Sequence, residues 1–317
     1  MSLTIGVDVG GTKILGLAVD HTADAEVGVE SRRPTPVGAA ALVDALVAVI
    51  EAVRADAPGE VTAVGVGVAG LVGLDGTLRV GPNLPGILDF PVVDAVRERV
   101  GLPVTADNDA TCATWAERER GAAAGARDAV LVTLGTGIGA GIVAGGELQR
   151  GANGFAGEPG HMVVDPHGPP CPCGRRGCWE RFASGSGLGR LARDAAHAGR
   201  AARMIELAGG DPENVKGEHV TAAAREGDAD AIAVFESFAW WVALGVANLV
   251  NVLDPAVVVV GGGLAEADEL LLAPVRIAYR ELVLAAPHRP EVAIVKAALG
   301  ERAGAIGAGL LAAARLP

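Results

Sequence analysis

Aromatic side chains are scarce in this sequence. Only ten of its 317 residues are Phe, Trp or Tyr, whereas half of the residues are apolar and 46 are Gly. A core must therefore be built from Val, Ala, Leu and Ile. Val- and Gly-rich runs beside Ala-rich stretches favour buried strands that alternate with helices, which is an α/β fold. The length fits one large domain or two medium-sized lobes.

Positive charge is also in short supply. The formal net charge is −12, which makes a poor surface for binding a nucleic-acid backbone. The first residues carry no basic segment and no long apolar run, so we expect no signal peptide and a cytoplasmic protein. The most apolar late stretch, residues 239–253, is too short to span a bilayer comfortably and contains two Asn residues. We expect it to form a buried helix.

Cysteine is rare, but three of the four cysteines stand within eight positions. A histidine stands ten residues before the first of them, and one imidazole with three thiolates is a complete tetrahedral ligand set for structural zinc. The predicted ligands are His161, Cys171, Cys173 and Cys178. Free thiols are the alternative interpretation, and His167 is an alternative ligand. A reducing compartment favours a metal over disulfides. The separate Cys112 is expected to be a small buried hydrophobe.

A strand, a glycine turn and a second strand occur twice in the chain. The first copy has Gly-Gly-Thr-Lys at residues 10–13, and the second has Gly-Thr-Gly at residues 135–137. Glycines let backbone N–H groups approach phosphate oxygens, and Asp8 before the first turn could hold Mg²⁺. One such turn is equally an ordinary hairpin, but its repetition favours two related lobes that bind phosphates from both sides. A third glycine turn, at residues 261–263, follows a strand and precedes a helical segment, as at many nucleotide sites.

Carboxylates occur at two further positions where they could act on a sugar. The run Asp-Asn-Asp-Ala at residues 107–110 joins a short strand to a helical segment. Phosphoryl transfer needs a carboxylate to accept the hydroxyl proton, although this run alone is more simply a helix N-cap. Glu158 and Glu180 flank the predicted metal loop and could accept hydrogen bonds from adjacent sugar hydroxyls. Solvated surface charge is the alternative for both.

Taken together, the runs at residues 8–13, 107–110, 157–161 and 171–180 resemble the ROK family of repressors, open reading frames and kinases. The resemblance extends from residue 5 to about residue 263. It implies an α/β, two-lobed, actin-like or hexokinase-type (RNase H-like) fold with a cleft between the lobes. We expect a small N-terminal lobe over 1–110 and a large lobe over 111–300 that carries the zinc loop. A C-terminal helix at 301–317 is expected to pack back on the small lobe.

The resemblance also implies roles for single residues. Asp109 looks like the catalytic base that takes the proton of a sugar 6-hydroxyl. The implied sugar ligands are Asn83, Asn108, Asp109, Glu158, His161 and Glu180. The implied phosphate and nucleotide contacts are Asp8, Gly10, Gly11, Thr12, Lys13, Thr136, Gly137, Gly262 and Gly263. Asp107 stands where the family commonly has Glu, which is a conservative departure.

The activity that the resemblance implies is ATP-dependent phosphorylation of the 6-hydroxyl of glucose, the glucokinase reaction. Kinases of N-acetylmannosamine, N-acetylglucosamine or fructose in the same family are the alternatives. A sugar-responsive transcriptional regulator is a different class. Such regulators carry a helix-turn-helix module before the first lobe, and we expect none here because the first strand begins at residue 3. The implied cofactors are ATP, Mg²⁺ and structural Zn²⁺, and the implied assembly is a homodimer or homotetramer.

Overall fold

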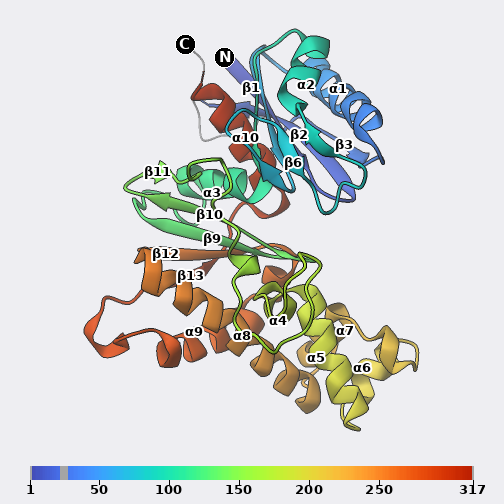
Figure 1. The fold of residues 1–317 in the computed structure, drawn as a ribbon, viewed down its shortest axis with the longest axis vertical. Helices are drawn as coiled ribbons and strands as arrows, with labels where there is room; N and C mark the ends of the chain where they lie inside the picture. Colours follow the sequence, from blue (N-terminus) through green and yellow to red (C-terminus); the bar gives the residue numbers. More distant parts are fainter. Residues whose placement is uncertain (1, 22–27, 316–317) are drawn as a thin grey trace. The chain divides into compact units, whose positions relative to one another are not determined.

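The computed structural model describes residues 2–21 and 28–315 (Figure 1). By its internal contacts the chain divides into two compact units. The first comprises Met1–Leu131, Gly141–Gly157 and Ala298–Pro317, and the second comprises Val132–Ala140 and Glu158–Ala297. The expected lobes, 1–110 and 111–300, stay a prediction, because packing contacts alone do not establish which residues move together.

A five-stranded sheet forms the centre of the first unit, in the order β3-β2-β1-β4-β8. Its strands are β1 (Ser2–Val9), β2 (Lys13–Asp20), β3 (Glu30–Pro34), β4 (Glu60–Val68) and β8 (Val104–Asn108). The first three strands pair antiparallel, whereas β1–β4 and β4–β8 pair in parallel. The near-continuous apolar runs of β1, β2 and β4 are buried, as expected for strands covered on both faces.

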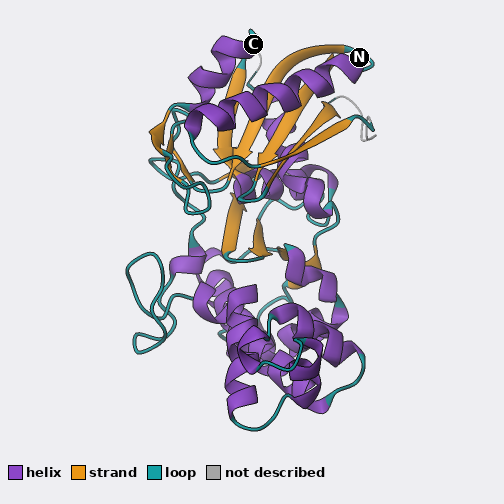
Figure 2. Cartoon of the chain, turned by 90° about the vertical axis from the view of Figure 1, so that its right-hand side faces the viewer, coloured by secondary structure: helices purple, strands orange, loops and turns teal. Residues whose placement is uncertain are grey.

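Helices cover the two faces of this sheet (Figure 2). On one face, α1 (Ala39–Asp56) and α2 (Val92–Val100) share a core cluster with Ile5 and Val7. Because side chains alternate along a strand, the residues between these point to the opposite face. That face packs against α10 (Ala303–Ala313), which the short η5 (Gly300–Arg302) precedes, and α3 (Asp109–Arg120) packs against α10. A small antiparallel sheet completes the unit, with strands β5 (Leu71–Val72), β6 (Leu78–Val80) and β7 (Leu88–Phe90).

The contact between α10 and its neighbours is made by backbone. Gly6 of β1 and Gly65 of β4 are paired in register, and a Cβ on either would overlap the backbone of α10. On the other side of the helix, a Cβ on Gly307 would overlap the carbonyl of Cys112 in α3. The Thr4 hydroxyl also donates to an α10 carbonyl at 2.8 Å. The expected C-terminal helix is thus present over 303–313, and residues 316 and 317 lie outside the described part of the chain.

The second five-stranded sheet has the order β11-β10-β9-β12-β13. Its strands are β9 (Ala129–Leu134), β10 (Ile138–Ala144), β11 (Glu147–Leu148), β12 (Val257–Gly261) and β13 (Ala293–Lys296). The two sheets have the same strand order: three consecutive strands stand in reverse order, and two later strands follow them. The predicted internal repeat is therefore confirmed.

Helices make up most of the rest of the second unit. They are α4 (Glu180–Ala183), α5 (Gly185–His197), α6 (Ala202–Leu207), α7 (Gly217–Arg225), α8 (Ala229–Leu253) and α9 (Glu269–Leu282), with 3-10 turns η1 (Pro159–His161), η2 (Pro212–Asn214), η3 (Gly263–Ala267) and η4 (Ala286–His288). The long apolar helix α8 passes the length and composition test for a membrane span, but 56% of its apolar window is buried within the protein. The predicted buried helix is confirmed. The argument from its length was wrong, because the helix begins ten residues earlier, after the N-cap Asp228.

Replacing Gly307 by Ala should destabilise the first unit, because the added methyl group has no space beside the Cys112 carbonyl. Overpacking of this kind costs about 1–3 kcal/mol, so we expect the midpoint of thermal unfolding to fall by roughly 2–12 °C. Gly263→Ala is the matched control, since nothing lies within 4 Å of a Cβ there. Equal midpoints for the two variants would contradict the backbone contact.

Candidate active site

The first glycine turn connects β1 to β2 as a hairpin. The Gly10 N–H donates to the Lys13 carbonyl at 3.0 Å. Thr35, just after β3, holds the turn from outside: its hydroxyl donates to the Gly10 carbonyl at 2.7 Å and its N–H to the Thr12 carbonyl at 3.1 Å. The hairpin interpretation is therefore correct for the backbone. A phosphate role for the same turn remains compatible with it.

The Lys13 ammonium pairs with Glu301, which precedes α10 and also pairs with Arg32 of β3. These two cations lower the pKa of the Glu301 carboxyl to about 2. All three side chains are about half exposed, so solvent screens the pairs and each contributes little to stability. No local pattern in the sequence points to Glu301, which lies 288 positions from Lys13.

Two carboxyl groups, those of Asp8 and Asp109, lie close enough to influence each other. Burial and, to a smaller extent, the charge of Asp109 raise the pKa of Asp8, whereas Lys13 lowers it; the resulting pKa is about 7. Burial also raises the pKa of Asp109, although hydrogen bonds from Ala110, its own backbone and Asn108 act in the opposite direction. The site is tight on the α10 side as well: a Cβ on Gly304 would lie 2.8 Å from the Asp8 carboxyl carbon. Such perturbed carboxyl groups are typical of functional sites.

Helix capping and the predicted base fall on different residues of the 107–110 run. The N-cap is Asn108, whose Oδ1 accepts from the Thr111 N–H at 3.0 Å. Its Nδ2 donates to the Gly70 carbonyl at 3.1 Å. Asp109 is the first residue of α3, where the helix dipole favours a negative charge. The structure thus confirms the cap and leaves Asp109 available for chemistry.

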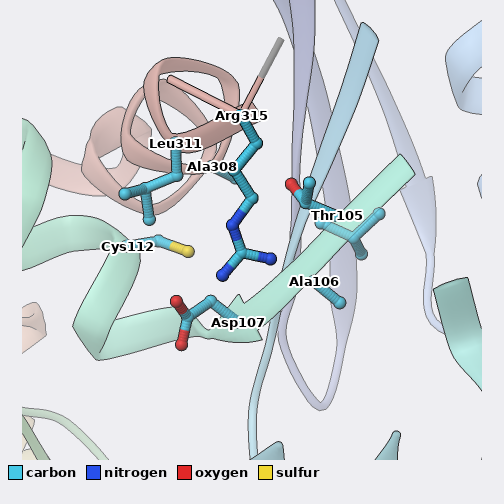
Figure 3. A pocket seen from close by; sticks show the side chains of 8 residues that line it. Thr105, Ala106, Asp107, Cys112, Ala308, Leu311 and Arg315 are labelled. Atoms are coloured by element: carbon cyan, nitrogen blue, oxygen red, sulfur yellow. The ribbon is translucent and has the colours of Figure 1, made fainter. Parts of the chain in front are cut away.

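Asp107 has a partner that the sequence did not reveal. The Arg150 Nε donates to its Oδ2 at 2.6 Å, from a loop 43 positions away. Figure 3 shows the Arg315 guanidinium pointing toward the same carboxylate, beside Cys112. The cavity between these side chains measures about 10 Å³, which is room for one water and too small for a sugar. Cys112 itself is fully buried, as predicted.

The four predicted metal ligands come together in the second unit. Their ligand atoms all lie within 4.8 Å of one another. The sulfurs of Cys173 and Cys178 are 3.5 Å apart, and the Cys171 sulfur lies 3.9 Å from the His161 Nδ1. A tetrahedral zinc ion about 2.3 Å from its sulfurs separates them by about 3.8 Å, so the spacing fits. Burial and the neighbouring thiols raise the pKa of Cys178 to about 12.

A buried tryptophan fixes the end of the metal loop. Trp179 follows the last cysteine, is fully buried, and its Nε1 donates to the Trp241 carbonyl of α8 at 2.7 Å. Its indole ring fits against α8 only because Gly245 has no side chain there. Cys178 and Glu180, on either side of Trp179, are therefore held by the helix core.

Glu180 in turn contacts the second glycine turn. Its Oε2 accepts from the Ile138 N–H at 2.9 Å, and a Cβ on Gly137 would overlap the same oxygen. The Gly135 carbonyl accepts from the N–H of Gly185, the first residue of α5, at 2.8 Å. Gly262 lies beside this turn as well, since a Cβ there would contact the Leu134 backbone.

The predicted site residues thus form two groups. The first unit holds the glycine turn at 10–13, Asp8, Asn108, Asp109 and Asn83, whose Cβ lies 2.8 Å from the position of a Cβ on Gly11. The second unit holds Thr136, Gly137, Glu158, His161, Glu180, the cysteine cluster, Gly262 and Gly263. Within it, η1 joins two of them, since the His161 N–H donates to the Glu158 carbonyl at 3.2 Å.

Comparison with known proteins agrees with this arrangement. The ROK family model matches residues 4–315. A glucokinase of Streptomyces coelicolor is 40% identical over 315 residues, which cover 98% of each chain. An N-acetylmannosamine kinase of Salmonella typhi is 34% identical over 314 residues and 98% of each chain. The crystal structure of a ROK glucokinase from Streptomyces griseus, in complex with glucose and AMPPNP, has a TM-score of 0.88 at 40% identity and covers 98% of this chain and 99% of that chain.

The fold and the paired glycine turns therefore define a two-lobed α/β protein of the sugar-kinase type, and the predicted fold class is confirmed. The chain belongs to the ROK family.

Asp8→Asn should make the protein more stable at neutral and alkaline pH. The pKa of Asp8 is about 7 in the folded state against 3.8 unfolded, so folding retains a proton that the unfolded chain releases between these values. Stability therefore falls as the pH rises from about 4 to about 7. We expect the variant and the unmodified protein to unfold at similar temperatures near pH 4, with the variant increasingly more stable up to pH 8. The measurement is thermal unfolding in EDTA without nucleotide. A stability difference between the variant and the unmodified protein that is no larger at pH 8 than at pH 4 would disprove the raised pKa of Asp8.

Protein purified without added metal should contain one zinc per chain by elemental analysis. Cys178→Ser should lose the metal and raise the KM for sugar, because Trp179 and Glu180 follow directly in the chain. Cys112→Ser is the control, since this buried thiol lies in the other unit and should leave the zinc content unchanged. A folded, active protein without zinc would exclude the metal site.

Proposed function

We propose that this protein is a glucokinase, which transfers the γ-phosphoryl group of ATP to the 6-hydroxyl of glucose. The observation that carries the proposal is the likeness, over nearly the whole chain, to a ROK glucokinase crystallised with glucose and AMPPNP. Asp109, the predicted base, supports it from the geometry: its carboxyl stands at the start of α3 with a raised pKa.

In the proposed reaction the Asp109 carboxylate takes the proton of the glucose 6-hydroxyl. The freed oxygen attacks the γ-phosphorus. The bond between the γ-phosphorus and the β–γ bridging oxygen then breaks, and ADP leaves. A raised pKa makes Asp109 a better proton acceptor, and desolvation is the cause. Asp8 would hold Mg²⁺, which neutralises phosphate charge when it is bound.

The remaining predicted contacts divide the substrates between the two groups of residues. Glucose would be bound by Asn83, Asn108, Glu158, His161 and Glu180. The nucleotide would be bound by the turns at 10–13 and 135–137 and by Gly262 and Gly263. His161 can serve twice: its Nδ1 faces the cysteine sulfurs, so its Nε2 is left for a sugar hydroxyl. Asn108 retains less capacity, because capping already uses its Oδ1.

A second candidate is phosphorylation of N-acetylmannosamine, which the 34% identity to a kinase of that sugar over 98% of the chain favours. Kinases of N-acetylglucosamine or fructose are further alternatives within the family. The Asp109 base would serve all of them. We also propose a cytoplasmic location and assembly into a homodimer or homotetramer; both rest on the sequence and the family resemblance.

A coupled assay for ADP release tests the function over glucose, mannose, fructose, N-acetylglucosamine and N-acetylmannosamine. We expect the highest kcat/KM with glucose.

Asp109→Asn should bind glucose nearly unchanged but lower kcat by several orders of magnitude, since the proton then has no acceptor. A preference for an acetylated sugar would replace glucokinase by the second candidate, and near-normal turnover of the variant would eliminate Asp109 as the base.

A further inference from the structure

Glu117 has no role in the site described above, yet it is the most deeply buried acidic side chain in the described part of the chain. It lies on α3, two turns beyond Asp109, and none of its surface is exposed. Its two carboxylate oxygens accept three backbone N–H groups, from Ala122 at 2.7 Å, Leu299 at 2.8 Å and Ala298 at 3.1 Å. Hydrogen bonds to a charged acceptor are stronger than neutral ones, and a buried carboxylate needs them.

The three donors come from two separate parts of the chain. Ala122 follows the C-terminal end of α3, where Gly121 leaves space because a Cβ there would overlap a Glu117 oxygen. Ala298 and Leu299 follow β13, at the point where the chain passes from the second unit back into the first. They also directly precede η5 and α10. Through these hydrogen bonds Glu117 connects α3 to the segment that leads into α10, where the chain re-enters the first unit.

Both of these helices reach the predicted catalytic carboxylates. Helix α3 begins at Asp109, and the first turn of α10 places Gly304 against the Asp8 carboxyl. Further along, Gly307 contacts the α3 backbone directly. A closed chain of contacts through these two helices therefore connects Asp109, Glu117, Leu299, Gly304 and Asp8. A shift of the α10 start relative to α3 would change the spacing of Asp8 and Asp109.

We propose that Glu117 is a positioning residue for phosphoryl transfer: through the Ala298 and Leu299 amides it fixes α10 against α3, and thereby fixes Asp8 relative to Asp109. This inference rests on the proposed function. Misplacing a reacting group by about 1 Å can lower the rate about 100-fold, so a clamp that acts only on spacing has a large effect on turnover. The candidate sugar contacts of the second unit do not depend on it.

Glu117→Gln tests the proposal in the full-length protein. The side chain keeps its size, but one of its two acceptors becomes an NH₂ donor that faces a backbone N–H. We expect kcat with glucose to fall about 10- to 100-fold, while the KM for glucose changes less than about 3-fold. Hydrogen exchange should show the Ala298 and Leu299 amides protected in the unmodified protein and rapidly exchanging in the variant. Glu119→Gln on the same helix is the control, since Glu119 pairs at the surface with Arg118 and should leave both readouts unchanged.

Glu117→Asp separates positioning from folding, because it keeps the charge and shortens the reach by one methylene. We expect it to fold and to recover part of the lost kcat; if Glu117→Gln does not fold, a normal kcat in Glu117→Asp overturns the proposal and a reduced kcat supports it. An unchanged kcat in folded Glu117→Gln overturns it as well, whatever happens to stability. If the unmodified protein phosphorylates none of the five sugars, the proposed function itself fails, and the role of Glu117 fails with it.

Discussion

The close approach of α10 to β1, β4 and α3 is the contact on which the rest of the first unit depends. Backbone lies directly on backbone at Gly6, Gly65 and Gly307, so none of these elements can shift sideways without a clash. Packed interiors of this density transmit displacement rather than absorb it. These contacts limit how far the Asp8 carboxyl at the end of β1 can move relative to the Asp109 carboxyl at the start of α3.

That rigidity holds together an arrangement that is electrostatically unfavourable. Asp8 and Asp109 are both desolvated, and the charge of one raises the pKa of the other. Without a bound ligand, the protein gains no stability from these two carboxyl groups, because a buried carboxylate without a cation costs stability. A bound cation such as Mg²⁺ would supply the missing positive charge. Functional sites often contain such unfavourable local arrangements, and the packing around them holds these arrangements in place.

Sequence reasoning worked where the signal was local. The strands expected on either side of the two glycine turns lie on mostly apolar runs, and the structure has them as β1, β2, β9 and β10. The ligands of the metal loop follow from spacing alone, since three of the four lie within eight positions. The pairs Lys13–Glu301 and Asp107–Arg150 join residues 288 and 43 positions apart, so no local pattern could reveal them. The start of α8 was missed because its first two turns are more polar than the rest and only the Asp228 cap marks it.

The metal loop and the second glycine turn are connected by direct contacts through residues 178–180. Cys178 is a predicted ligand, Trp179 is anchored in the α8 core, and Glu180 accepts from the Ile138 N–H beside Gly137. Three successive residues thus connect the cysteine cluster, the helical core and the turn. Zinc bound to the Cys178 thiolate would hold this residue in place and, through the indole of Trp179, the Glu180 carboxylate. A metal with no open coordination position would in this way act on Glu180, a proposed sugar ligand, and on the second glycine turn without taking part in the chemistry.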